Sequence, residues 1–181
     1  MRDGVPVKPS GSRIPLISGH LDEETAALVD LVTKPDGTQL HTVAVLAHQP
    51  ALMAPFLGWA AALSLQSALP RRDHELLALR TARNFRSTFE WDEHTDYARQ
   101  AGLSDAELSA VRADPDAGTW TGHERALLIA ADELHDDHRI SDGTWRLLAG
   151  HYDVGQLVEI PYVVGQYAML SMVANALEHD E

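Results

Sequence analysis

The chain has 181 residues, a length that suits one domain, and 45% hydrophobic against 23% charged residues is the balance of an ordinary globular protein. Its 27 acidic and 14 basic side chains give a net charge of −13, the opposite sign to that of most nucleic-acid binders, so we expect no nucleic-acid partner. Cysteine is absent, which excludes disulfides, thiol redox chemistry and zinc sites built on thiolates.

The N-terminal residues hold no apolar stretch that could act as a signal peptide, and the lack of cysteine fits a reducing compartment. We therefore expect a soluble, cytoplasmic protein. Two long stretches, 37–70 and 160–177, contain no charged side chain, but the first is interrupted by histidines and prolines and the second by Pro161 and polar side chains such as Gln166. A spanning helix needs about 20 predominantly apolar residues. We interpret both stretches as helices buried in a core or subunit interface, and expect no membrane partner.

Residues 1–20 hold three of the nine prolines and three glycines, and are expected to form an extended or partly ordered arm. Residues 21–181 are expected to form a single helical domain. Helix start and stop signals predict helices over about 22–32, 39–47, 50–67, 71–84 and 87–100, two more opening at the capping boxes of Ser104 and Thr121, one over 142–149, and a last one from Asp153 to about Glu178.

Within the last of these helices, Pro161 is expected to cause a kink or a split. No segment alternates like a half-buried strand, and none carries a hairpin signal. The pattern predicts an all-α fold of about eight helices.

The densest polar grouping lies in the fifth predicted helix. Ser87, Glu90 and His94 are spaced i, i+3 and i+7, so they share one helix face, and Tyr97 continues it. A carboxylate one turn from an imidazole is a sensible acid/base unit, because it fixes the tautomer and supports the imidazolium. The alternative is a solvated face, since further acidic residues lie in the same helix.

Together with Glu75, these residues have the spacing of a known sequence motif. The chain resembles the carboxymuconolactone decarboxylase and alkylhydroperoxidase D-like superfamily, whose core motif is Glu, eleven residues, Cys, two residues, Cys, three residues, His. Here the frame is Glu75, Ser87, Glu90 and His94, with every spacing kept and both cysteines replaced. The flanking segments resemble the subgroup without cysteine, over roughly residues 12–178: 46–50, 69–80, 101–104, 124–128, 164–167 and 175–177.

The resemblance implies an all-α bundle that assembles as trimers or hexamers. It does not carry over peroxidase activity, since that branch of the family needs the cysteine pair. The decarboxylase branch implies proton transfer beside a carbonyl or lactone with loss of carbon dioxide. Glu75, Glu90 and His94 are then the candidate catalytic residues, for a small anionic lactone or carbonyl compound.

Five further residues are candidates for substrate binding. Arg80 belongs to a group of five arginines between 71 and 86 and lies in a Leu-rich helix, so it is expected to point inward and hold a carboxylate. The alternative is an ion pair with Glu75, Glu90 or a neighbouring subunit. Ser87, Trp91 and Tyr97 lie in or beside the motif helix. His48 is expected to line the pocket or, alternatively, to bond a helix terminus.

Metal ligation is considered at His135 and His138, which are spaced i, i+3 among acidic residues. The segment is better interpreted as the charged end of a helix, and the Glu-x-x-His pairs of a di-iron bundle are missing. We expect neither a metal nor a cofactor. Two alternatives to a decarboxylase stay open: a lyase, isomerase or cyclase of secondary metabolism on the same scaffold, and a non-catalytic oligomer that binds a small molecule.

Overall fold

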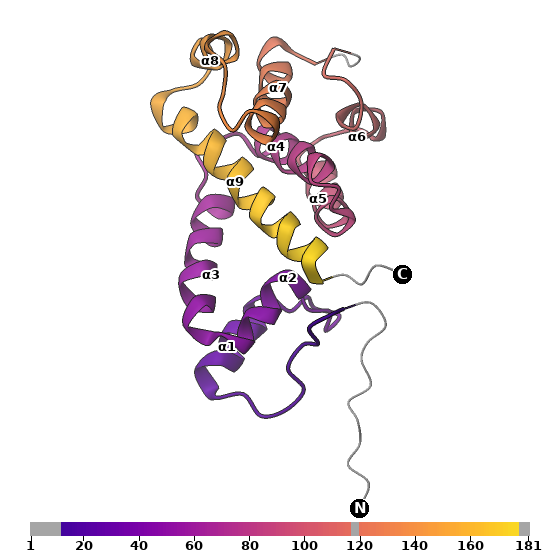
Figure 1. Ribbon diagram of the computed structural model, residues 1–181, viewed down its shortest axis with the longest axis vertical. Coiled ribbons are helices and arrows are strands. Elements are labelled where there is room, and N and C mark those ends of the chain that lie inside the picture. The colour runs from indigo at the N-terminus through magenta and orange to yellow at the C-terminus, as the bar shows by residue number, and fades with distance from the viewer. Residues whose placement is uncertain (1–11, 117–119, 178–181) are drawn as a thin grey trace, which may run out of the picture. The chain divides into compact units, whose positions relative to one another are not determined.

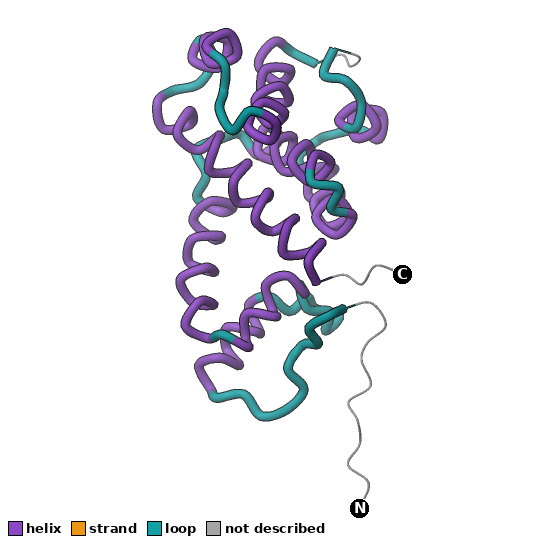
Figure 2. The backbone as a smooth tube through the Cα atoms, viewed as in Figure 1, coloured by secondary structure: helices purple, strands orange, loops and turns teal. Residues whose placement is uncertain are grey.

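The computed structural model describes residues 12–116 and 120–177, and within them the chain forms helices and no strand, apart from one isolated bridge between Thr33 and Gln39 (Figure 2). The predicted all-α fold is confirmed. The helices are α1 Glu23–Leu31, α2 His41–Ala44, α3 Pro50–Leu65, α4 Arg71–Asn84, α5 Thr88–Gln100, α6 Asp105–Val111, α7 Gly122–Asp136, α8 Asp142–Ala149 and α9 Val154–Leu177, with a 3₁₀ turn η1 at Val45–His48 (Figure 1). Most of the predicted arm lies outside the described residues.

The helix starts follow the capping chemistry of the sequence. Ser104 and Thr121 each accept a hydrogen bond from the backbone N–H three residues on, and the glutamate there bonds back, so both predicted capping boxes are confirmed. Gly102 follows the C-cap of α5 and has φ +93°, a left-handed conformation that suits glycine because a side chain would be strained there. It stops the helix.

The long helix α9 runs through Pro161 without interruption, so the predicted split is wrong. Proline removes one backbone donor but does not forbid a helix whose neighbouring turns are held by packing. Leu157, Ile160 and Val164 on either side of it are all buried in the core. Their burial supplies the stability that holds the helix together across the missing hydrogen bond.

The described residues group into two compact units. One consists of the chain up to Trp59 together with the residues from Val173 onward, and the other is Ala60–Met172. In the first unit Met53 is fully buried, and the N–H of Arg13 donates to the carbonyl of Leu177 over 2.7 Å. The prediction of a single domain over 21–181 stays a prediction.

The second unit is built around α4, the helix that positions the candidate site. Ten consecutive residues of α4, from Asp73 to Ala82, are buried. Leu77 packs with apolar side chains of α7, α8 and α9, and Leu76 packs in a separate cluster with Trp91 of α5 and Leu108 of α6. A helix covered on every side must satisfy its polar side chains internally, since an unpaired buried polar group costs several kcal/mol, roughly 2–7.

Helix α9 is apolar on two sides. Its Leu157, Ile160 and Tyr167 face the core, whereas Val154 and Val158 are 77% and 52% exposed. Among the described residues it is the one helix long and apolar enough to cross a membrane by length and composition, with 44% of its most apolar window buried. Core helices of soluble proteins pass the same test, and this helix supplies five side chains to the core of the second unit.

Candidate active site

Four polar side chains of α4 lie inside the second unit, and each has partners on another helix. Asp73, His74, Glu75 and Arg80 are all at most 3% exposed. Burial of such groups is costly unless they are paired, so their partners define where polar chemistry is concentrated.

Glu75 is bound on both sides. Its Oε2 lies 2.7 Å from Nδ1 of His94 on α5, and its Oε1 lies 2.8 Å from Nη2 of Arg71, one turn earlier on α4. A carboxylate only accepts, so the proton of this short bond belongs to Nδ1 of His94. The imidazole is thereby fixed with Nε2 directed to the other side.

On that other side stands Glu90. Its Oε2 is 4.0 Å from Nε2 of His94, one turn away on α5. The side chain of His94 is only 12% exposed, and that of Glu90 only 4%. Burial raises the pKa of Glu90 to about 7, with nearby Glu93 adding to the shift and His94 opposing it. Glu90 therefore changes its protonation state near neutral pH, as a general acid must.

Tyr167 of α9 closes the site from a third helix. Its ring lies edge-on to His94 with the centroids 4.4 Å apart, and its hydroxyl is 2.9 Å from Nε2 of His74. Burial raises the pKa of Tyr167 and lowers that of His74 to about 4, so both are neutral at pH 7. They line the site with uncharged hydrogen-bonding groups.

The other predicted residues of α5 have different surroundings. Ser87 caps α5 by accepting a hydrogen bond from the N–H of Glu90. Tyr97 is 40% exposed, with its ring 5.7 Å from that of His94 and the Arg71 guanidinium 5.5 Å from its centroid. It therefore stands at the outer edge of the site.

Trp91 packs in the apolar cluster with Leu76 of α4 and Leu108 of α6, and it also reaches a surface cleft. Its ring carries the guanidinium of Arg112 at 3.7 Å, and it lines this cleft of about 320 Å³ with residues of α5 and α6. Glu75, Glu90 and His94 are not among the residues of this cleft. The structure thus separates Trp91 from the acid/base residues.

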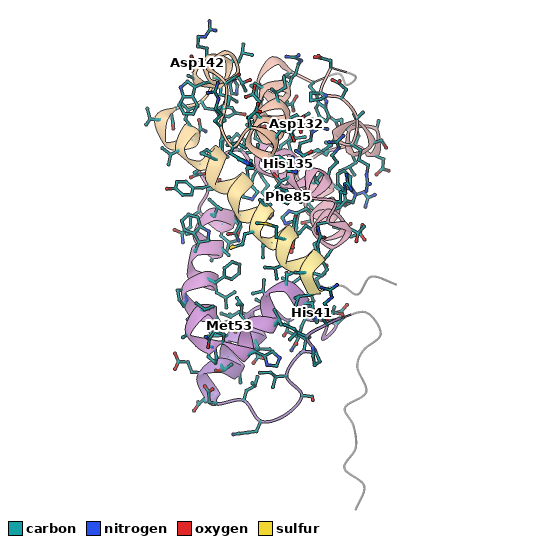
Figure 3. The ribbon with its side chains drawn as sticks, viewed as in Figure 1. His41, Met53, Phe85, Asp132, His135 and Asp142 are labelled. Carbon is teal, nitrogen blue, oxygen red and sulfur yellow. The ribbon has the colours of Figure 1, made fainter. Side chains whose placement is uncertain are left out.

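Arg80 is not beside the acid/base residues either. Its guanidinium donates twice to Asp132 of α7, labelled in Figure 3, and once each to the carbonyls of Val111 and Ala113. Four of its five N–H donors are thereby used. Arg80 is thus in an ion pair, but its partner is Asp132 and not Glu75 or Glu90, the partners within the chain that the alternative named; its substrate-binding role stays a prediction.

His48 belongs to the first unit, where its Nε2 lies 2.8 Å from the carbonyl of Pro15. This is a hydrogen bond to the main chain of an irregular segment before α1, and not the bond to a helix terminus that was considered for it; its place in a pocket stays a prediction. The arginine beside the acid/base residues is Arg71, which the sequence analysis did not single out. Helical spacing was the signal available, since Arg71 is i−4 to Glu75 and therefore on its face.

His74 and Tyr167 were also absent from the predicted site. Their contact joins positions 93 residues apart, and no periodicity reports such a pair. A second polar group of α4 and α7, Asp73 with His123 and Glu124, has the residue types of a metal site, and its ligand atoms lie within 4.8 Å of one another.

Comparisons with known proteins agree with this architecture. Residues 50–133 match the family model of the carboxymuconolactone decarboxylase family. No curated protein matches the chain. Among solved structures, an uncharacterized peroxidase-related protein from Silicibacter sp. TM1040 superimposes with a TM-score of 0.75 at 17% identity, covering 97% of this chain and 93% of that one.

Two further solved structures have the same fold. The alkylhydroperoxidase AhpD core of a peroxidase-related protein from Ralstonia eutropha JMP134 gives a TM-score of 0.76 at 17% identity, covering 94% of this chain and 92% of that one. A protein of unknown function from Agrobacterium tumefaciens gives 0.66 at 20% identity, covering 73% and 91%. The chain, which contains no cysteine, thus matches the carboxymuconolactone decarboxylase family model over residues 50–133 and has the all-α alkylhydroperoxidase D-like fold of these structures.

Proposed function

We propose that the chain is a cofactor-independent enzyme that moves protons on a small anionic lactone or carbonyl compound, with decarboxylation as the preferred reaction type. The observation that carries the proposal is the row Arg71, Glu75, His94 and Glu90, in which each charged or titratable group faces the next. Glu90, at one end of this row, has its pKa raised to about 7 by burial, which is typical of a carboxyl group that takes part in acid/base catalysis.

The roles follow from the contacts. Glu75 holds His94 in the tautomer that leaves Nε2 available as a base, and it supports the positive charge that Nε2 gains on protonation. Glu90, with a pKa of about 7, is the acid that returns a proton to the substrate. An atom about 2.8 Å from both Nε2 and Oε2 fits the 4.0 Å separation, so one substrate atom can contact base and acid together.

Recognition of an anion is assigned to Arg71. Its side chain is 43% exposed, and its guanidinium contacts Glu75, the carbonyl of Ser64 and the face of the Tyr97 ring. This arrangement presents a positive charge at the edge of the site without burying it unpaired. A substrate carboxylate bound there would lie beside the acid/base pair.

The test is a panel of carboxylated lactones and β-keto acids, followed by release of carbon dioxide and by change in ultraviolet absorbance. The proposal expects turnover by the wild type, and loss of it in His94→Gln but not in the control variant His135→Gln. Ring opening or isomerisation without carbon dioxide would support the lyase or isomerase alternative. Thermal stabilisation by a panel compound without turnover would support the non-catalytic binder and would overturn the enzyme proposal.

A further inference from the structure

A second polar cluster of the same unit is not used by the proposed reaction. It joins Asp73 of α4 to His123 and Glu124 at the start of α7, with His151 and Tyr152 of the connection between α8 and α9 beside them. Asp73 and Glu124 are 3% and 6% exposed. Two carboxylates buried so close together repel each other unless a positive charge lies between them.

The hydrogen bonds of the cluster leave Nε2 of His123 and Oδ1 of Asp73 facing each other without a hydrogen bond between them. The hydroxyl of Thr121 donates to Oε2 of Glu124 over 2.7 Å, so its oxygen can only accept from Nδ1 of His123, 3.1 Å away. In the neutral imidazole the proton is thus on Nδ1, and Nε2 carries a lone pair. That lone pair faces Oδ1 of Asp73 at 3.8 Å.

Oδ1 of Asp73 is an acceptor as well. The other oxygen of this carboxylate, Oδ2, receives the hydroxyl proton of Tyr152 over 2.8 Å. Two acceptors therefore face each other at a distance too long for a direct hydrogen bond. A divalent ion about 2.0–2.2 Å from each of two ligands spans separations up to about 4.2 Å, so the 3.8 Å gap has the right width for one.

We propose that Asp73, His123 and Glu124 bind a divalent first-row transition metal ion of the zinc type. The set offers one imidazole nitrogen and two carboxylate oxygens, the mixture that such ions accept and that leaves a fourth position for water. All three ligand atoms lie within 4.8 Å of one another, and tetrahedral ligands of such an ion are about 3.4 Å apart, so closure onto an ion shortens the widest separation by up to about 1.4 Å.

The surrounding residues hold the ligands as the outer groups of metal sites do. His151 stacks on His123 with the rings 3.8 Å apart and 3° from parallel, which fixes the plane of the imidazole. Tyr152 fixes the Asp73 carboxylate, and Arg72 donates to Oε1 of Glu124 over 2.7 Å. Oδ1 of Asp73 and Oε1 of Glu124 keep a free lone pair after these bonds, whereas Oε2 of Glu124 accepts twice from Thr121.

The ion would join α4 to α7 on the Asp73 side of α4. Asp73 directly precedes His74 and Glu75 of the candidate active site, so metal binding would also stiffen the start of the helix that carries the catalytic carboxylate. The sequence analysis expected no metal because it examined only near neighbours in sequence. Asp73 and His123 are 50 residues apart and become neighbours only in the fold.

The experiment loads chelator-treated full-length protein with Zn²⁺, removes free ion by gel filtration, and measures bound zinc by elemental analysis. His123→Phe keeps a ring to stack on His151 but removes both nitrogens. His135→Phe is the matched control, because His135 lies on the same helix beside a carboxylate, with Nδ1 2.6 Å from Oδ1 of Asp136. We expect one equivalent of zinc in the wild type and the control.

Binding by His123→Phe should be weaker by more than about tenfold, since even loss of an outer partner costs roughly 10–100-fold. In the wild type and in His135→Phe, but not in His123→Phe, Zn²⁺ at 100 times its dissociation constant should raise the unfolding midpoint by roughly 5–10 °C, whereas Mg²⁺ should not. Co²⁺ should give visible absorption bands that Zn²⁺ abolishes. Less than a tenth of an equivalent in the wild type, or equal retention by His123→Phe, would overturn the proposal.

Discussion

Glu90 and His94 occupy successive turns of α5, and Oε2 of Glu90 stops 4.0 Å short of Nε2 of His94. This separation is too long for a direct hydrogen bond, although both groups are almost fully buried. On its other face the same imidazole makes a short 2.7 Å contact with Glu75. His94 is thus tightly held by one carboxylate and leaves room for a single atom before the other.

Replacing Glu75 by Gln should separate orientation from charge. The amide oxygen still accepts the hydrogen bond of His94 Nδ1, but it no longer stabilises a protonated imidazole. We expect kcat on any accepted substrate to fall by about 10²–10⁴, with KM changed much less. Steady-state kinetics beside the control His135→Gln would check this, and a change confined to KM would contradict a catalytic role for Glu75.

The raised pKa of Glu90 predicts a pH dependence of stability. In the folded chain burial keeps Glu90 protonated up to about pH 7, whereas the ordinary value is 4.5, so the folded state binds the proton more tightly. The resulting stabilisation is complete below about pH 4.5 and is lost as the pH rises through 7. Between pH 5 and 8 the wild type should therefore lose about 2 kcal/mol relative to Glu90→Gln.

His74 acts in the opposite direction, which is why the comparison is made between the two proteins. Its pKa is lowered to about 4 by burial, so its contribution to stability increases as the pH rises from about 4 to 6.5. This contribution is common to wild type and Glu90→Gln and cancels in their difference. Urea unfolding at a series of pH values measures both curves; parallel curves would show that Glu90 is not titrating in this range.

The helices and the pairing of Glu75 with His94 were within reach of the sequence, since capping boxes and motif spacing are local. The arginine beside Glu75 could also have been chosen from local spacing, but the sequence analysis singled out Arg80 rather than Arg71. Arg71 is four residues from Glu75 and shares its face, whereas Arg80 is five residues away and lies well round the helix. Arg80 was expected to point inward because its helix is apolar, and its side chain is indeed buried. Since α4 is buried on every side, however, a buried side chain can point either toward Glu75 or toward another part of the core.

Contacts between distant helices could not be predicted in the same way. Tyr167 meets His74 across 93 residues, and Tyr152 meets Asp73 across 79. Neither pair leaves a periodic signal, because each depends on how α9, or the connection before it, packs against α4. The cluster of Asp73, His123 and Glu124 also joins residues far apart in sequence, so a search for short-range ligand spacings does not find it.

Removal of Arg80 should affect folding stability. Arg80→Met would leave two main-chain carbonyls without their donor and Asp132 with Asn84 as its remaining donor, and breaking such a buried pair costs about 3–5 kcal/mol. Arg83→Met, at an exposed position of the same helix, is the control and should cost less than about 1 kcal/mol. Denaturant unfolding compares them. A rise in KM at unchanged stability would instead support the substrate-binding role first expected of Arg80.

The exposed apolar side of α9 supports the prediction of a homo-oligomer. Val154, Val158, Tyr162 and Met169 fall on one side of the helix and are each at least 39% exposed, although the opposite side is already in the core. A charge there, as in Val158→Glu, should weaken assembly, whereas Leu31→Glu, at another exposed position, should not. Light scattering measures both, and a wild type that is monomeric at micromolar concentration would contradict the prediction.

We predict that the protein has no thiol peroxidase activity, because it lacks the side chains that this reaction requires. Such catalysis needs a thiolate to attack the peroxide and a second thiol to resolve the sulfenic acid, and the chain contains no cysteine. At the two motif positions, Ser87 caps α5 and Glu90 is a buried carboxyl group. Neither is oxidised by peroxide and recycled through a disulfide, and methionine sulfoxide needs a separate reductase.

Peroxide consumption by chelator-treated protein, with a dithiol reductant, checks this prediction. A thiol peroxidase in the same buffer establishes the sensitivity of the assay, and buffer with reductant gives the background. We expect the rate to equal that background at every protein concentration. A rate that grows with protein and survives the chelator would contradict the prediction. It would also count against the acid/base proposal, because the same residues would then have to take part in an oxidation for which Glu75, Glu90 and His94 offer only protons.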